Sequence, residues 1–167
     1  MFYKSTVAAL AIFAALPAFA EITVTDAYAR SSASMSQSGA AFMAITNTGE
    51  DDRVTGATSD AAERVELHTH IKDANGVMKM VEVKEGFPLP SGSTHMLQRG
   101  ADHIMFMGLT APFEQGKMIH VTLTFEKAAP LEIEVPVDLQ RGGAMQGKME
   151  MNGKMQMNGH DHSKMGN

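Results

Sequence analysis

The stretch HIMFM begins at His103 and places one imidazole and two thioethers at alternating positions. In a β-strand, His103, Met105 and Met107 would share one face, and Ile104 and Phe106 would share the other. The second face is apolar enough to belong to a core. A thioether sulfur is a soft ligand that selects Cu(I), and imidazole binds copper, zinc and nickel. The first face is therefore a candidate part of a copper site.

Two other stretches repeat this arrangement of His or Met at positions i and i+2. In ERVELHTHI, His68 and His70 lie on the face opposite Leu67 and Ile71. In GVMKMVEVK, Met78 and Met80 lie on the face opposite Val77 and Val81. Three such strands that meet on one face would supply two imidazoles and two thioethers, a donor set that favours Cu(I). The apolar residues that we expect to face the core are Val65, Leu67, Ile71, Val77, Val81 and Val83.

Ordinary explanations exist for each of these residues taken singly. A Met in a strand is most often core filler, and this reading stays open for Met107. A His on a polar strand face is usually solvated, and we interpret His120 and the loop residue His95 in this way. The grouping of donors on three strands, more than any one residue, favours a metal site.

The elements that must position these residues are β-strands. Period-two alternation recurs after Glu21, broken by turn residues, which is typical of a sandwich or barrel. We expect about eight strands, all antiparallel because no crossover helices intervene. The stretches 87–94 and 112–117 are predicted to be connections. The predicted strands are 21–30, 39–49, 53–59, 63–71, 76–84, 103–109, 118–127 and 131–137.

Composition excludes several classes of function. The chain has no Cys, which removes disulfides, thiolate metal sites and a blue-copper centre. The formal net charge of −5 argues against nucleic-acid binding. No nucleophile elbow, glycine-rich phosphate loop or HExxH motif is present, so we predict that the protein is not an enzyme.

Residues 1–20 have the pattern of a secretory signal peptide. Lys4 supplies the positive charge, an apolar run follows, and AFA at 18–20 is a small-x-small cleavage site. The mature chain is expected to begin at Glu21, to reach the periplasm and to contain no membrane span. An uncleaved membrane anchor is the alternative, although no Cys is available to carry a lipid.

The composition changes near Arg141. Residues 141–167 contain no aromatic and no β-branched residue, which predicts a disordered tail after a domain spanning 21–140. The tail repeats KMEMNG and KMQMNG and then contains HDH. Thioethers suit Cu(I), while two imidazoles with a carboxylate better suit Cu(II). The alternative is a tail that increases solubility and does not bind metal. The candidate ligands are Met149, Met151, Met155, Met157, His160 and His162.

The stretches VELHTHI, GVMKMVEV, PLPSGST, ADHIMFMGL and VTLTFEKA together resemble the periplasmic copper chaperones of the PCu(A)C family. The resemblance covers about residues 21–138. The family's motif of a His, a Met and a closing His-x-Met falls on His68, Met80, His103 and Met105. Each of the two gaps is one residue longer than in the family, which leaves His70 as an alternative to His68.

This resemblance implies an all-β, cupredoxin-like (Greek-key) antiparallel β-sandwich that binds one Cu(I) through two His and two Met. It further implies a monomeric periplasmic carrier that delivers copper towards cytochrome oxidase assembly, to an oxidase subunit or another copper chaperone. Some family members have a Met/His-rich extension that binds further copper, including Cu(II). Three other classes compete with this one: a copper-sequestering or resistance protein, an Ig-like structural module without metal, and a copper redox enzyme.

Overall fold

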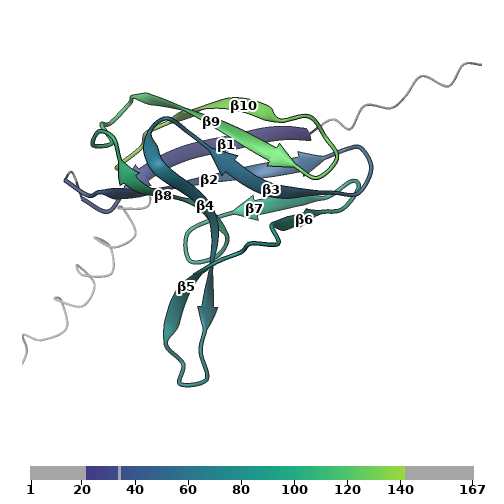
Figure 1. Cartoon of the computed structure of the whole chain (residues 1–167), viewed down its shortest axis with the longest axis horizontal. Helices are drawn as coiled ribbons and strands as arrows, with labels where there is room; N and C mark the ends of the chain where they lie inside the picture. Colours follow the sequence, from purple (N-terminus) through teal and green to yellow (C-terminus); the bar gives the residue numbers. More distant parts are fainter. Residues whose placement is uncertain (1–21, 34, 142–167) are drawn as a thin grey trace, which may run out of the picture.

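The computed structural model describes residues 22–33 and 35–141, and within them every regular element is a β-strand. Ten strands follow one another along this part of the chain (Figure 1). No helix in the described ranges is long and apolar enough to cross a membrane. The strands are β1 (Ile22–Ser31), β2 (Ser38–Asn47), β3 (Asp52–Thr58), β4 (Ala62–Lys72), β5 (Met78–Glu82), β6 (Phe87–Leu89), β7 (Thr94–Leu97), β8 (His103–Leu109), β9 (Met118–Phe125) and β10 (Leu131–Pro136).

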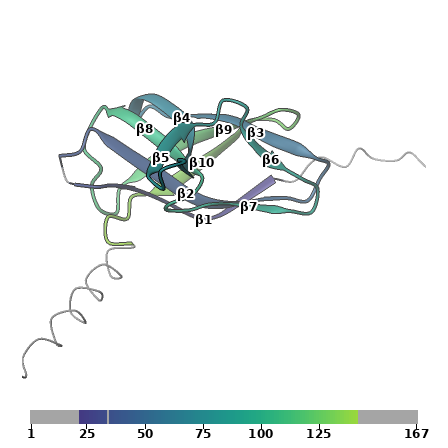
Figure 2. The ribbon, with the colours of Figure 1, turned by 90° about the horizontal axis from the view of Figure 1, so that it is seen from below.

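The strands form two sheets that pack face to face (Figure 2). One sheet has the order β1-β2-β8-β4-β5, with β7 also paired to β2. The other has the order β10-β9-β3-β6. All pairings between these strands are antiparallel, as predicted, and one isolated parallel bridge joins Ala29 to Val137.

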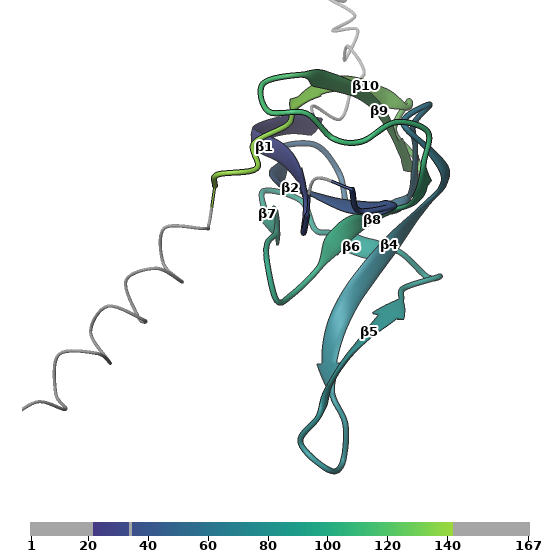
Figure 3. The same ribbon diagram turned by 90° about the vertical axis from the view of Figure 1, so that its left-hand side faces the viewer.

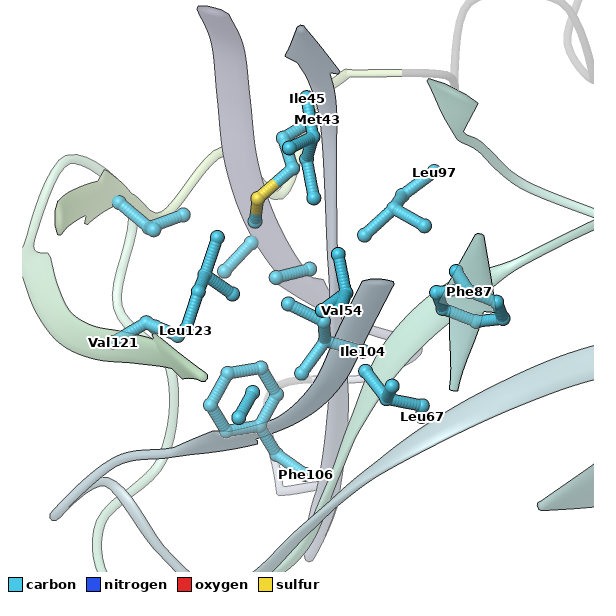
Figure 4. Packing of buried hydrophobic residues seen from close by; sticks show 14 of the residues in the cluster. Met43, Ile45, Val54, Leu67, Phe87, Leu97, Ile104, Phe106, Val121 and Leu123 are labelled. Carbon is cyan, nitrogen blue, oxygen red and sulfur yellow. The ribbon is translucent and has the colours of Figure 1, made fainter. Parts of the chain in front are cut away.

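The core lies between the two sheets and is built by alternation (Figure 4). Ile104 and Phe106 of β8 are fully buried and meet Val121 and Leu123 of β9 within one apolar cluster. Burial of such a side chain stabilises the fold by about 1.5–3 kcal/mol. Because the even-numbered residues of β8 face the core, His103, Met105 and Met107 lie on the outer face of the six-stranded sheet.

The β4–β5 hairpin projects beyond the body of the sandwich (Figure 3). Asp73 closes its turn by accepting hydrogen bonds from the backbone N–H groups of Asn75 (2.9 Å) and Val77 (3.0 Å). The prediction that Ile71 and Val77 face the core is wrong, since 44% and 55% of their surfaces are exposed. Alternation still holds in this hairpin, but no second sheet covers it.

The stretch 87–94 is predicted to be a simple connection, but the structure differs. This stretch contains β6 and the first residue of β7, so the described part of the chain has ten strands and not eight. Both strands are short, and the Pro and Gly residues in this stretch obscure the alternation by which strands are recognised. Gly86 permits the chain to enter β6, because its φ is +75° and a Cβ there would collide with the Val54 carbonyl.

The last described residue, Arg141, lies against β1 at the place where this strand has a register shift. The shift falls between Thr25 and Tyr28, and Asp26 has a φ of +55°. Arg141 forms an ion pair with Asp26, and its guanidinium lies 4.1 Å from the Tyr28 ring centroid. The last described residue, Arg141, therefore lies beside β1.

Candidate metal centre

Strand pairing brings the three predicted donor strands together on one face. Across β4 and β8, His68 lies directly opposite His103, and across β4 and β5, His70 lies opposite Met80. Directly opposite residues in a sheet point to the same side. The order β8-β4-β5 therefore places these four donors on the outer face of the six-stranded sheet.

The closest contact among the donors joins β8 to β5. His103 Nε2 lies 3.2 Å from Met80 Sδ, although 23 positions separate the two residues in sequence. The His70 ring centroid is 5.1 Å from that of His103, and the His68 centroid is 5.9 Å away. Met80 is 44% exposed, so this cluster opens to solvent on the side of the hairpin.

The His103 ring is held in a defined orientation. Its Nδ1 is 2.9 Å from the Ala101 carbonyl oxygen. A carbonyl can only accept, so Nδ1 carries the proton and Nε2 presents its lone pair towards Met80. Burial lowers the pKa of His103, and the neighbouring His70 and His68 lower it further, while the Ala101 carbonyl opposes them. The imidazole is therefore neutral at neutral pH and needs no proton displaced before it binds a metal.

His68 is buried, which its place on a polar strand face did not predict. Its Nε2 donates to Glu66 Oε2 at 2.9 Å. Its Nδ1 is buried and makes no hydrogen bond to any described residue. A buried polar atom without a partner costs about 1–3 kcal/mol. A metal ion bound at this lone pair would remove that cost, so the residues present fit a metal.

Met105 shares the outer face but lies one step further along β8. Its cross-strand neighbours are Glu66 on β4 and Ala40 on β2. It lines a groove of about 380 Å³ that also includes Phe42 and Arg99. Within the described residues, Met105 makes no hydrogen bond to His68, Met80 or His103. Met107 accepts a hydrogen bond from Arg64 Nη2 at 3.4 Å.

The remaining histidines of the domain have different roles. The prediction for His95 is wrong, because it lies in β7, hydrogen-bonds Asp102 at 2.8 Å and stacks on Phe87 with 5.0 Å between centroids. The prediction for His120 is confirmed: its side chain is 72% exposed and lies 4.0 Å from Glu134. Because β7 is too short for its alternation to be recognised in the sequence, the partners of His95 could not be predicted.

Several predicted features lie outside the described residues. These are the signal peptide at 1–20 and the candidate tail ligands Met149, Met151, Met155, Met157, His160 and His162. Within the described ranges, no group of three or more His, Cys, Asp or Glu side chains is arranged to hold a metal ion.

Sequence reasoning missed two groups that orient the imidazoles. One is the Glu66 carboxylate, and the other is the Ala101 carbonyl. Glu66 could have been found, because Glu-x-His in a strand puts both side chains on one face. The Ala101 carbonyl gives no signal in the sequence, since it depends on the path of the loop before β8.

Solved structures with the same architecture are copper-site domains. The copper-bound PCuAC domain from PmoF2 superposes with a TM-score of 0.58 at 20% identity, covering 71% of this chain and 92% of that one. The solution structure of CuI-DR1885 from Deinococcus radiodurans gives a TM-score of 0.54 at 29% identity, covering 72% and 81%. The fold is thus that of a PCuAC-like domain, which confirms the predicted cupredoxin-like β-sandwich.

A sequence profile described as "Putative lipoprotein LpqE-like" matches residues 22–137. The chain belongs to this LpqE-like family. It is also 46% identical over 99 residues to "Putative lipoprotein Lxx21020" from Leifsonia xyli subsp. xyli. That match spans 59% of this chain and 59% of the relative.

Proposed function

We propose that this protein is a copper metallochaperone of the periplasm that holds Cu(I) on the outer face of its six-stranded sheet. The observation that carries the proposal is the 3.2 Å approach of His103 Nε2 to Met80 Sδ. Strand pairing brings together these two residues, 23 positions apart in sequence, and both are donors that suit Cu(I). Copper in two solved structures of similar fold, the copper-bound PCuAC domain from PmoF2 and CuI-DR1885, supports this choice of metal.

The proposed ligands are His68, Met80, His103 and Met105. His68 is preferred to His70 because its Nδ1 is buried and has no hydrogen-bond partner among the described residues. Two thioethers and two neutral imidazoles form a soft, uncharged set that suits Cu(I). Met105 would complete the set by a rotation of its side chain towards His103.

A carrier must also release its cargo. Met80 stands on the projecting hairpin and is partly exposed, so an incoming donor can replace it first. The more deeply buried His103 and His68 would release the ion afterwards. We propose that the acceptor is a protein of cytochrome oxidase assembly, either an oxidase subunit or another copper chaperone. The carrier acts as a monomer and is not an enzyme.

The tail is proposed as a second copper-binding segment, with Met149, Met151, Met155 and Met157 suited to Cu(I) and His160 and His162 to Cu(II). The position of Arg141, the last described residue before the tail, supports this role. A series of ring contacts leads from Arg141 to His103. Arg141 contacts Tyr28 (4.1 Å), Tyr28 contacts Phe42 (5.1 Å), and Phe42 contacts His103 (6.2 Å).

These separations put the Arg141 guanidinium within about 16 Å of the His103 ring. Met149 follows Arg141 by eight residues, enough for an extended span of roughly 26 Å. Tail methionines can therefore reach the sheet site. Tethering gives them a high effective concentration there.

The test is a Cu(I) titration of the mature chain against a competing chelator. The double variant His103→Ala/Met105→Ala should lose most of its affinity for one Cu(I) ion. A chain truncated after Arg141 should retain that affinity. If the double variant retains full affinity and the shortened chain loses it, the sheet site is wrong.

Transfer needs a separate measurement, because a sequestering protein would pass the titration as well. The Cu(I)-loaded chain is mixed with the copper-free oxidase subunit, and copper in each protein is measured after they are separated. We expect copper to move to the subunit. Retention of all copper by the chain would favour sequestration.

A further inference from the structure

Glu66 stands at the centre of a chain of contacts along the outer face of β4. Its Oε2 accepts the 2.9 Å hydrogen bond from His68 Nε2, and its Oε1 lies 3.8 Å from Arg64 Nε. Arg64 in turn donates to Met107 Sδ at 3.4 Å. The three β4 residues occur at i, i+2 and i+4, so the strand itself aligns them.

Burial makes the Glu66 contact selective. The Glu66 side chain is 23% exposed and that of His68 is 10% exposed, whereas Arg64 is 68% exposed. A carboxylate can only accept, so the 2.9 Å contact requires a proton on Nε2. A neutral imidazole has one N–H, so in that form Nδ1, which is buried and has no partner among the described residues, carries a lone pair.

The two imidazoles of the centre are thus oriented by different acceptors. A backbone carbonyl holds the proton of His103 on Nδ1, and a carboxylate holds that of His68 on Nε2. Metal-binding imidazoles usually donate their other N–H to such an acceptor, which fixes the tautomer and raises ligand basicity. The outer-face arrangement supplies one acceptor for each ring.

We propose that Glu66 is a positioning residue that keeps His68 in the tautomer whose Nδ1 binds copper. This inference rests on the proposed function for its purpose, but the tautomer itself is a property of the metal-free protein. Glu66 does not itself ligate the ion. Its charge also offsets that of a bound cation, since both thioethers and both imidazoles are neutral.

Glu82 provides a matched control on the same face. It lies directly opposite His68 across β4 and β5, whereas Glu66 precedes His68 by two residues on β4. Its carboxylate is 3.9 Å from Lys84 Nζ. Glu82→Ala therefore removes one negative charge beside His68 without removing the hydrogen bond to Nε2.

The experiment records imidazole ¹⁵N chemical shifts of the metal-free full chain and then titrates Cu(I) against a chelator. In the wild type we expect a His68 spectrum with Nε2 protonated and Nδ1 not. In Glu66→Ala the two shifts should move towards a tautomer average, and Cu(I) affinity should fall by about 10–100-fold. Glu82→Ala should leave the shifts unchanged and the affinity within about twofold.

Glu66→Gln separates the hydrogen bond from the charge, because the amide oxygen can still accept from Nε2. We expect it to keep the wild-type tautomer. The proposal is overturned if Glu66→Ala leaves the His68 shifts unchanged, or if Glu66→Gln and Glu82→Ala lose as much affinity as Glu66→Ala. If the wild type fails to bind Cu(I), the proposed function fails, whereas the tautomer result still stands. Amide spectra of each variant establish that it is folded.

Discussion

Strands β8 and β9 carry the same two donor types at the same spacing, yet only one of them forms part of the candidate centre. His103-x-Met105 in β8 and Met118-x-His120 in β9 both lie on the outer face of a sheet. His103 is 2% exposed and meets Met80. The His120 side chain is 72% exposed and faces Glu134 across β10.

The neighbours of these two strands explain the difference. Beside β8 stands β4 with two imidazoles, and beyond it β5 with a thioether. Beside β9 stands β10, whose outer residues are Glu132 and Glu134. The copper site is proposed where the donor pair of β8 lies beside further imidazole and thioether donors, whereas the pair of β9 lies beside the carboxylates of β10.

A choice of site by groove volume alone would have selected β9 and not β8. The groove over β9 and β10 has a volume of about 600 Å³, compared with about 380 Å³ for the groove at Met105. The larger groove is lined by Asp60, His120, Glu132 and Glu134 among others. Oxygen ligands of this kind suit hard cations and offer Cu(I) little, so ligand chemistry outweighs volume here.

Replacing the histidine of each strand should give the largest difference between the two faces. His103→Ala is expected to lower Cu(I) affinity by more than about 100-fold, because it removes a buried ligand that contacts Met80. His120→Ala should leave the affinity unchanged. Both are measured by competition with a Cu(I) chelator. Equal losses in the two variants would remove the distinction between the faces.

Replacement of Asp52 tests whether the four-stranded sheet has a purely structural role. Burial would raise its pKa, but hydrogen bonds from the backbone N–H groups of Arg53, Ala128 and Lys127 outweigh burial and hold the pKa below its usual value. Asp52→Asn should therefore reduce the free energy of unfolding by about 2 kcal/mol at neutral pH. Cu(I) affinity should not change. Denaturant unfolding and the titration above measure the two quantities.

The pH dependence of this effect has a definite sign. A carboxyl with a lower pKa in the folded state stabilises the fold above its unfolded pKa, which is 3.8 for Asp52. That stability is lost as the pH falls from 3.8 through the lower, folded value. The difference between wild type and Asp52→Asn should therefore shrink on acidification below about pH 4. A constant difference would contradict this account.

The thioether of β5 should have a smaller effect than the imidazole of β8. Met80→Ala is expected to weaken Cu(I) binding roughly tenfold, or about 1.4 kcal/mol, because the exposed ligand at the hairpin can be replaced by solvent. Met118→Ala is the matched control on β9, with similar exposure. The chelator competition again decides, and a loss in Met118→Ala as large as that in Met80→Ala would count against the site.

The hairpin itself should contribute least to stability. Ile71→Thr is expected to change the free energy of unfolding by no more than about 0.5 kcal/mol, because Ile71 packs against no second sheet. Leu67→Ala, four residues earlier on the same face of β4 and 4% exposed, should cost about 2–5 kcal/mol. Urea unfolding of the two variants compares them. A large loss in Ile71→Thr would show that the projecting hairpin is part of the core.

Much of the fold was predictable because alternation is a local property. The strands around His68, His103 and Leu123 were expected, and the burial of Ile104 and Phe106 followed from the period of two. Failures occurred where a residue's surroundings depend on distant elements. Ile71 alternates like a core residue but projects beyond the sandwich, and His95 lies in a strand too short to show alternation.

The sequence by itself determined the donor types, their spacing within each strand and the absence of thiolate chemistry. These follow from residue identity and from the alternation of side chains along a strand. Only the tertiary structure decided which strands are neighbours, and hence that His103 meets Met80 while His120 meets Glu134. It also decided which nitrogen of each imidazole is available, because the acceptors on Glu66 and Ala101 act through space. Pairing between distant strands sets these contacts, and no local pattern encodes it.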